Sequence, residues 1–355
     1  MAILTIILSI LTGLTLLAVL LPFVHNSYWV FRVFEYPRFQ KLIACVILLA
    51  AWLARGDVLT ALPLVSIACL VPAIAYLTGK VFPYTSWSRT EMLPAIPAAD
   101  GARIRIFSAN VWQDNTNHAG FLDIIRRQDP DIVMLLETDD AWERAMRPLE
   151  QIYPHREKKP IGNTYGLLFY SRLPVRSSAI RFLVEPGVPS LEAVIELPNG
   201  QPVQIWGLHP KPPLPAENCR SDAKDKELMQ VAFKARGCAL PVIVLGDLND
   251  VAWSHTTELF RKTSQLLDPR RGRGFYSTFS ARHWWLKFPL DYIFASTHFS
   301  LVGMKRLPPT GSDHYPIFIE LQYSDALTQI QEAPEADAEE LKEARETVTA
   351  EVSGI

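Results

Sequence analysis

Long apolar segments without charge occupy the first 80 residues of the chain, and short ones separated by polar residues occupy most of the rest. Residues 2–24 and 58–77 contain no charged side chain. As helices, both are long enough to cross the ~30 Å hydrocarbon core of a bilayer. Residues 42–54 form a third apolar segment of only 13 residues, which is short for a span. We therefore expect residues 1–78 to form a membrane domain of two or three transmembrane helices, and we favour three.

Beyond residue 100 the apolar runs have the length and alternation of buried strands, and helical periodicity is rarer. The pattern predicts helices at 118–128, 139–149 and 221–236, and strands at 103–108, 131–136, 165–170, 191–197, 203–208, 241–245, 290–295, 299–304 and 317–321. Strands outnumber helices and do not alternate regularly with them. This favours packed sheets with flanking helices over a doubly wound parallel sheet.

Two segments outside these regions differ from them in composition. Residues 79–100 contain three prolines and the aromatic residues Phe82, Tyr84 and Trp87, which predicts a linker that leaves the bilayer with its aromatic rings at headgroup level. Residues 324–355 carry a net charge of −7, and we expect an acidic and mostly disordered tail.

The charge of the region between linker and tail limits the classes of substrate. The whole chain has a net charge of −2, while residues 101–323 alone carry +3. A mildly basic region suits an anionic substrate. It lacks, however, the strongly basic stripe of a dedicated nucleic-acid binder.

Polar side chains follow the predicted strands at or just beyond their ends, where an α/β protein assembles a site from distant parts of the chain. They are Asn110, Glu137, His209, Asp247, Asn249, Asp291, Asp313 and His314. Carboxylates and amides without thiolates suit a hard divalent cation such as Mg²⁺ or Mn²⁺. Such an ion stabilises charge on phosphoryl oxygens, so this set of residues predicts hydrolysis of a phosphate ester.

Six short motifs carry a specific resemblance. They are Ser-Ala-Asn-Val-Trp (108–112), Leu-Leu-Glu-Thr (135–138), Gly-Leu-His-Pro (207–210), Gly-Asp-Leu-Asn-Asp (246–250), Leu-Asp-Tyr-Ile-Phe (290–294) and Gly-Ser-Asp-His (311–314). In this order they resemble the endonuclease/exonuclease/phosphatase superfamily, and the apolar segments before them resemble its membrane-anchored bacterial members. The resemblance implies a catalytic domain over residues 101–323. It also implies a four-layer α/β sandwich, in which two packed, mainly antiparallel sheets are flanked by helices.

The resemblance also implies which residues hold the metal. Glu137 would be the main ligand with Asn110 beside it, and Asp313 would touch the ion or its water. Tyr165 matches a residue that contacts the phosphate. The ion would be Mg²⁺ or Mn²⁺.

The catalytic roles that the resemblance implies fall on five residues. Asp247 would orient or deprotonate the attacking water, and Asn249 would hold the nucleophile or a phosphate oxygen. His314 would contact the scissile phosphate or transfer a proton, with Asp291 orienting its ring. His209 would donate a hydrogen bond to the phosphate or the leaving group.

Two further segments are candidates for substrate binding. Lys211 follows His209 closely, and Arg270, Arg271 and Arg273 concentrate three guanidinium groups, which suit bidentate phosphate contacts. Trp284 and the tryptophan after it stand between cationic residues. These rings could stack nucleobases, lie in a membrane interface or pack into the core.

These observations predict a membrane-anchored, metal-dependent phosphoesterase that cleaves a phosphate mono- or diester by in-line attack of water. The substrate would be a lipid or polyprenyl phosphate or a nucleic acid. The alternatives are a DNA or RNA nuclease and a non-catalytic binding module that retains the fold. We expect an integral protein of the bacterial inner membrane. Charge bias places the catalytic domain in the cytoplasm, whereas similar membrane-tethered proteins have it outside, so its side stays open.

Overall fold

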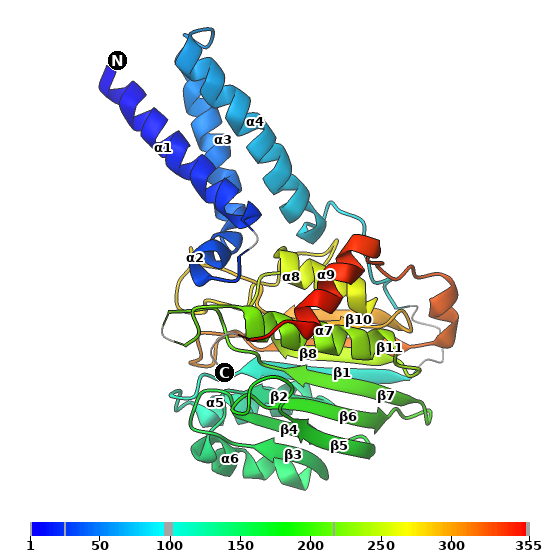
Figure 1. Ribbon diagram of the computed structural model, residues 1–355. Helices are drawn as coiled ribbons and strands as arrows, with labels where there is room; N and C mark the ends of the chain where they lie inside the picture. Colours follow the sequence, from blue (N-terminus) through cyan, green and yellow to red (C-terminus); the bar gives the residue numbers. More distant parts are fainter. Residues whose placement is uncertain (1, 25, 96–101, 216, 353–355) are drawn as a thin grey trace.

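The computed structural model describes residues 2–24, 26–95, 102–215 and 217–352, and two stacked β-sheets form its centre (Figure 1). The first sheet has six strands in the order β10-β11-β1-β2-β4-β3, and the second has five in the order β5-β6-β7-β8-β9. Only the pairs β1–β2 and β7–β8 are parallel. The predicted pair of mainly antiparallel sheets is therefore confirmed.

The strand bounds follow the apolar runs of the sequence. The strands are β1 (Arg103–Asn110), β2 (Ile132–Leu136), β3 (His155–Lys159), β4 (Leu167–Ser171), β5 (Val175–Arg181), β6 (Ser190–Glu196), β7 (Pro202–Leu208), β8 (Val242–Asp247), β9 (Asp291–Ala295), β10 (Phe299–Arg306) and β11 (Ile317–Tyr323). The nine predicted strands are all present. β3 and β5 were missed because they are edge strands, where charged and polar side chains remain in water.

Helices cover the outer face of each sheet and complete four layers. Helices α5 (His118–Gln128) and α6 (Asp140–Met146) pack on the first sheet, and α7 (Asp222–Arg236) and α8 (His255–Ser264) pack on the second. Alternation along β1 shows why both faces are buried. Ile104 and Ile106 point between the sheets, while Phe107 and Ala109 lie under the helices. Short 3₁₀ turns lie at Leu21–Phe23, Val33–Glu35, Phe82–Tyr84, Arg147–Gln151 and Asp325–Gln329.

The apolar N-terminal segments form three long helices, α1 (Ala2–Leu20), α3 (Arg38–Ala54) and α4 (Ala61–Val81), which stand together away from the sheets (Figure 1). Among the described residues, two helices are long and apolar enough to cross a membrane. The number becomes three if the bent pair Trp29–Glu35 and Arg38–Ala54 forms one span. A short helix, α2 (Trp29–Arg32), connects α1 to α3. The side chain of Trp52 donates a hydrogen bond of 3.0 Å to Thr12 and ties α3 to α1.

The linker differs from its prediction. Tyr84 is buried, donates a hydrogen bond of 2.6 Å to the carbonyl of Ala252 and packs edge-on against Trp253, so its ring belongs to the catalytic domain and not to a bilayer surface. Trp87 is exposed. The last part of the predicted linker, residues 96–100, lies outside the described residues.

The prediction of a mostly disordered tail is wrong. Helix α9 (Ala338–Thr349) begins with a capping box in which Asp337 and Glu340 satisfy each other's backbone amides. Ala344 is fully buried against the second sheet's helices, and Glu340 pairs with Lys262 at 2.5 Å. The prediction from net charge failed because acidic side chains of this tail form ion pairs with residues of α8.

A charged residue at position 344 should release α9. Ala344→Asp would bury a carboxylate without a partner, at a cost of about 2 kcal/mol. We expect a lower thermal midpoint and rapid amide hydrogen exchange across residues 338–349. Arg345→Asp, which places the same side chain at an exposed position, is the control. Equal protection of the α9 amides from hydrogen exchange in both variants would contradict the packing of α9 against the helices of the second sheet.

Candidate active site

Both parallel strand pairs bring their carboxyl ends to one end of the sandwich. Asn110 ends β1, Glu137 follows β2, His209 follows β7 and Asp247 ends β8. Antiparallel to β8, strand β9 begins with Asp291 directly opposite Asp247. The carboxyl groups of two sheets therefore meet although they are far apart in sequence.

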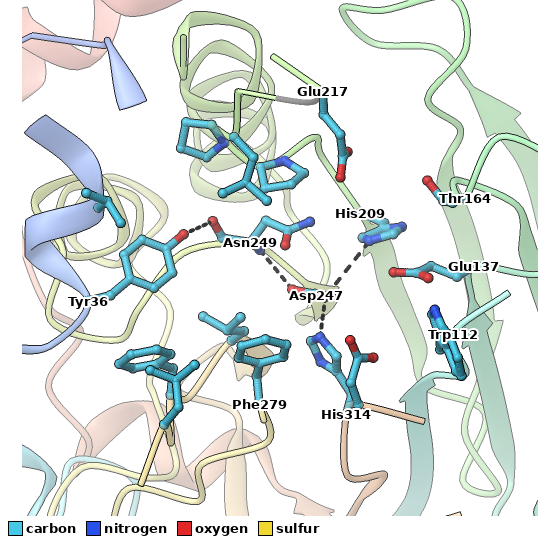
Figure 2. A pocket seen from close by; sticks show the side chains of 18 of the residues that line it. Tyr36, Trp112, Glu137, Thr164, His209, Glu217, Asp247, Asn249, Phe279 and His314 are labelled. Atoms are coloured by element: carbon cyan, nitrogen blue, oxygen red, sulfur yellow. Dashed lines mark hydrogen bonds and ion pairs between the residues drawn. The ribbon is translucent and has the colours of Figure 1, made fainter. Parts of the chain in front are cut away.

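A cavity of about 600 Å³ opens at this point (Figure 2). Of the predicted site residues, Glu137, Tyr165, His209, Asp247, Asn249, Asp313 and His314 line it. Asn110 and Asp291 lie behind that lining and hold residues of it. The structure thus gathers the eight strand-end residues and Tyr165 into one place.

The backbone around the cavity adopts unusual conformations with positive φ, which neighbouring contacts must stabilise. Glu137 and Asn249 have φ values of +60° and +49°, in the left-handed region. Gly246 has a φ of +134°, and a Cβ there would lie 2.0 Å from the carbonyl oxygen of Leu208. Only glycine allows β7 and β8 to pair this closely before Asp247.

One amide joins two carboxylates from different sheets, the half-buried Glu137 and the buried Asp247. The amide nitrogen of Asn110 donates to Glu137 Oε1 at 2.7 Å and to Asp247 Oδ2 at 3.1 Å. Its oxygen accepts from the backbone of Trp112 at 3.0 Å. In this orientation the Asn110 amide holds Glu137 and Asp247 in place, and its role beside the metal stays a prediction. Burial raises the pKa of Glu137 to about 7, although the Asn110 hydrogen bond opposes the shift.

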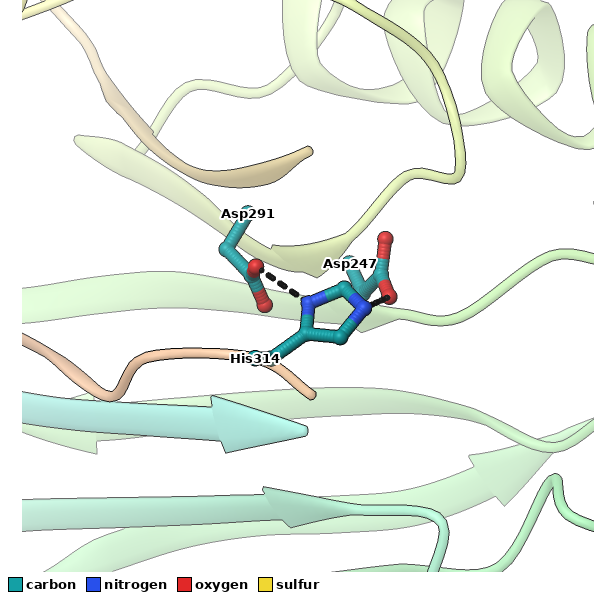
Figure 3. A group of neighbouring side chains, drawn as sticks. All are labelled: Asp247, Asp291 and His314. Atoms are coloured by element: carbon teal, nitrogen blue, oxygen red, sulfur yellow. Dashed lines mark hydrogen bonds and ion pairs between the residues drawn. The ribbon is translucent and has the colours of Figure 1, made fainter. Parts of the chain in front are cut away.

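His314 is an imidazolium held between two carboxylates (Figure 3). Its Nδ1 lies 2.8 Å from Asp291 Oδ2, and its Nε2 lies 3.6 Å from Asp247 Oδ2. Burial alone would lower the pKa of His314, but Asp291 and Asp247 raise it to about 10. At neutral pH the ring is therefore charged and directs a proton on Nε2 toward Asp247.

His209 has the opposite character. Burial lowers its pKa to about 4 despite the nearby Asp247 carboxylate, whose Oδ2 lies 3.9 Å from Nε2. Its Nδ1 is buried without a hydrogen-bond partner. The ring packs beside that of Tyr165 at 5.2 Å, and the Tyr165 hydroxyl donates to Glu217. A neutral ring in this position can donate one hydrogen bond to a ligand.

The donor set fits a hard divalent cation. Glu137, Asp247, Asp291 and Asp313 supply four carboxyl groups, and His314 is the cation that faces them. Among the described residues, no lysine or arginine lines the cavity. A phosphate would be repelled there unless a cation offset these charges.

The group Asp247, Asp291 and His314, or else the Glu137 carboxylate, could hold such an ion. Asp247, Asp291 and His314 offer ligand atoms within 4.8 Å of one another. In that group, however, His314 Nδ1 and Asp291 Oδ2 already bond each other directly. Within the described part of the chain, Glu137 has no comparable cationic partner, which favours it as the ligand.

The predicted arginine contacts with substrate are wrong. Arg270 is fully buried, makes a bidentate pair with Asp268 and stacks 4.0 Å over the ring of Tyr292. Arg271 bonds Glu258 at 2.8 Å, and Arg273 donates to the carbonyl of Met92 at 2.6 Å. These guanidinium groups hold the loop to the domain. The sequence could not show this for Arg271 and Arg273 because the fold brings Glu258 and the carbonyl of Met92 to them.

The other two predicted substrate contacts also lie outside the cavity lining. Lys211 pairs with Glu185 at 2.8 Å and lies 5.8 Å from the ring centroid of Tyr165. Trp284 is 86% exposed, so core packing does not explain it. Its role in substrate binding stays a prediction.

The sequence analysis missed one entire wall of the cavity. Val33, Tyr36 and Pro37 come from the connection between α1 and α3, and Leu286 and Phe288 come from the loop before β9 (Figure 2). Residues 28–41 carry aromatic and charged side chains between apolar helices. This mixture of aromatic and charged residues is the one signal in the sequence that the segment packs against another part of the protein.

Comparisons with known proteins agree with this geometry. Residues 107–314 match the Endonuclease/Exonuclease/phosphatase family. No curated protein matches the sequence. Among solved structures, D. rerio TDP2 complexed with a single-strand DNA product has a TM-score of 0.52 at 17% identity, covering 62% of this chain and 98% of that one.

Two further structures have the same fold. The human Nocturnin catalytic domain, with a bound sulfate anion, has a TM-score of 0.50 at 20% identity. The match covers 62% of this chain and 95% of the Nocturnin chain. An endonuclease/exonuclease/phosphatase family protein from Bacteroides thetaiotaomicron has a TM-score of 0.51 at 15% identity. The match covers 64% of this chain and 98% of that protein's chain. At these identities the likeness shows the fold.

Replacing Asp291 by asparagine should lower the pKa of His314. In the wild-type protein, the ion pair stabilises the fold fully below pH 6.5, and this contribution is lost as the pH rises through about 10. In Asp291→Asn burial dominates, and the ring should titrate near or below the ordinary value of about 6.5. Histidine NMR titration of the metal-free protein measures this. An unchanged His314 titration would contradict the assigned cause.

Proposed function

This chain belongs to the Endonuclease/Exonuclease/phosphatase family of phosphoester hydrolases, and we propose that it is a membrane-anchored, Mg²⁺-dependent phosphoesterase. The observation that carries the proposal is the cavity itself. Glu137, Asp247 and Asp313 line it and Asp291 lies behind them, with one buried imidazolium and one buried neutral imidazole beside these carboxyl groups. This combination can bind an ion, accept a proton from water and donate hydrogen bonds to a phosphate.

Asp247 is the proposed base. Burial raises its pKa above the usual range, with the charged His314 ring opposing, so it accepts a proton more readily than an exposed carboxylate. Its Oδ1 accepts a hydrogen bond of 2.9 Å from the backbone of Asn249, and its Oδ2, which accepts one of 3.1 Å from Asn110, is proposed to orient the attacking water through its second lone pair. A Mg²⁺ ion held by Glu137 and Asp313 would supply charge stabilisation to the phosphoryl oxygens.

The two histidines are proposed to act on opposite sides of the phosphate. His314 carries its proton at neutral pH and can donate it from Nε2 to a phosphate oxygen, with Asp291 fixing the ring. His209 is neutral and can donate a hydrogen bond to the leaving oxygen. The opposite pKa shifts of these two buried rings support the division of roles.

The remaining cavity lining supports a lipid phosphate as the substrate class. Part of the lining is apolar and includes Val33, Pro37, Leu214, Leu286 and Phe288. Helix α1 ends before, and α3 begins after, the segment that carries Val33 and Pro37. A phosphate ester with a hydrocarbon part would place its charge at the carboxylate side and its chain against these side chains. The anchor is proposed to lie in the bacterial inner membrane.

One feature favours nuclease activity as a second candidate. The Arg282 guanidinium lies 3.8 Å from the ring centroid of Trp112, which lines the cavity. Trp284, two residues away, is largely exposed. The Arg282–Trp112 pair and the exposed indole of Trp284 offer surfaces on which nucleobases can stack.

Removing the Glu137 charge should abolish metal-dependent turnover. We expect Glu137→Gln to reduce Mg²⁺-dependent hydrolysis of bis(p-nitrophenyl) phosphate about 100-fold or more, since the ion contributes several kcal/mol. Calorimetry should show weaker Mn²⁺ binding.

Glu227→Gln is the matched control. Burial also raises the pKa of Glu227 to about 7, but this residue bonds Ser190 at 2.6 Å and does not line the cavity. Equal losses of hydrolysis in both variants would show that removing any buried carboxyl group lowers activity, and that Glu137 has no special role.

The apolar wall can be tested with Leu286→Ser. Losing about 1.4 kcal/mol of apolar contact should raise KM about tenfold for farnesyl phosphate or dioleoyl phosphatidate in mixed micelles. Ile330→Ser, at a 62% exposed position away from the cavity, is the control. Nicking of supercoiled plasmid by the full-length protein, with both lipids left intact, would favour the nuclease instead.

A further inference from the structure

The segment between α1 and α3 is attached to the catalytic domain. Residues 26–37 precede the catalytic domain by more than 60 positions, yet Val33, Tyr36 and Pro37 line the active-site cavity. Figure 2 shows Tyr36 on the wall opposite Glu137, with Asp247 and His314 between them. The membrane domain therefore contributes side chains to the site.

Backbone hydrogen bonds and charges fix this segment to the start of α7. Ser221 donates its amide to the carbonyl of Ser27 at 2.8 Å, and Trp29 donates to the carbonyl of Cys219 at 2.8 Å. The Arg32 guanidinium bonds Asp225 and also Ser221. These contacts satisfy backbone groups and a buried charge, so separating the two parts would leave both unpaired.

A second set of contacts fixes the segment to the loop that follows β8. Buried Arg38 donates to the carbonyl of Trp253 at 2.6 Å, and the indole of Trp253 donates to the carbonyl of Glu35 at 3.0 Å. Tyr36 lies between these two contacts. Its ring meets that of Phe288 edge-on at 5.6 Å.

The Tyr36 hydroxyl donates a hydrogen bond of 2.7 Å to the carbonyl oxygen of Asn249. Asn249 is the residue with left-handed φ in the Asp247–Asn249 turn. Its amide bonds the Asp247 carboxylate at 2.9 Å, and its side chain donates to the carbonyl of Pro210 at 2.9 Å. Tyr36 therefore supplies the outer hydrogen bond of a strained turn that carries the proposed base.

We propose that residues 26–37 form a working part of the active site and that Tyr36 is a positioning residue for Asp247 and Asn249. The inference rests on the proposed function, because it assigns the turn to phosphate-ester hydrolysis. Tyr36 acts through the Asn249 carbonyl and need not touch the reacting atoms. It follows that activity depends on the membrane domain being docked.

Tyr36→Phe removes this hydroxyl and retains the ring. We expect kcat to fall about tenfold with KM within twofold, because a small displacement of the turn misplaces the base while the cavity lining is unchanged. The assay uses full-length protein in detergent with Mg²⁺. Its substrates are p-nitrophenyl phosphate, a monoester, and bis(p-nitrophenyl) phosphate, a diester.

Tyr153→Phe is the matched control. Like Tyr36, Tyr153 has a hydroxyl that donates to a backbone carbonyl, that of Pro130 at 2.9 Å, but its ring is buried under the helices of the first sheet. Both variants should lower the thermal midpoint to a similar extent. Only Tyr36→Phe should lower kcat.

The outcomes separate this inference from the function on which it rests. If the wild-type protein hydrolyses either ester and Tyr36→Phe matches Tyr153→Phe in kcat, the positioning role is overturned while the phosphoesterase stands. If the wild-type protein hydrolyses neither ester with Mg²⁺, the proposed function fails and the inference fails with it.

Discussion

The burial of several carboxyl groups at one point is the constraint on which the rest of this structure depends. Glu137 and Asp247 come from different sheets and share the amide of Asn110. Asp291 stands behind them, and His314 offers only one positive charge. Such an arrangement is costly in a protein interior unless a cation completes it. The raised pKa values of Glu137 and Asp247 express that cost in the metal-free protein.

The fold supplies the rigidity that keeps these groups together. Each sheet contains one parallel pair, and both pairs end at the cavity. The two sheets enclose a core of aliphatic side chains, so the strand ends cannot separate without opening it. The left-handed backbone at Glu137 and Asn249 is stable only because neighbouring hydrogen bonds determine it.

The sequence was sufficient to predict what depends on local patterns. Apolar runs located the central strands, and the polar residues at their ends gave Glu137, Asp247 and His314. Contacts between distant segments could not be predicted in this way. Arg273 resembled a phosphate ligand because the Met92 carbonyl reaches it only in the folded protein, and the acidic tail resembled a disordered one because α8 carries its partners. Tyr36 was missed since nothing in its own segment indicates Asn249.

The central claim is that these carboxylates hold a divalent ion at Glu137 inside a cavity that residues 26–37 help to enclose. The most direct measurement is a crystal structure of the full-length protein soaked with Mn²⁺, in which anomalous scattering locates the ion. The account predicts a peak bonded to the Glu137 carboxylate, with the His314–Asp291 pair intact and the Tyr36 hydroxyl on Asn249. A peak between His314 and Asp291, or no peak in the cavity, would contradict it.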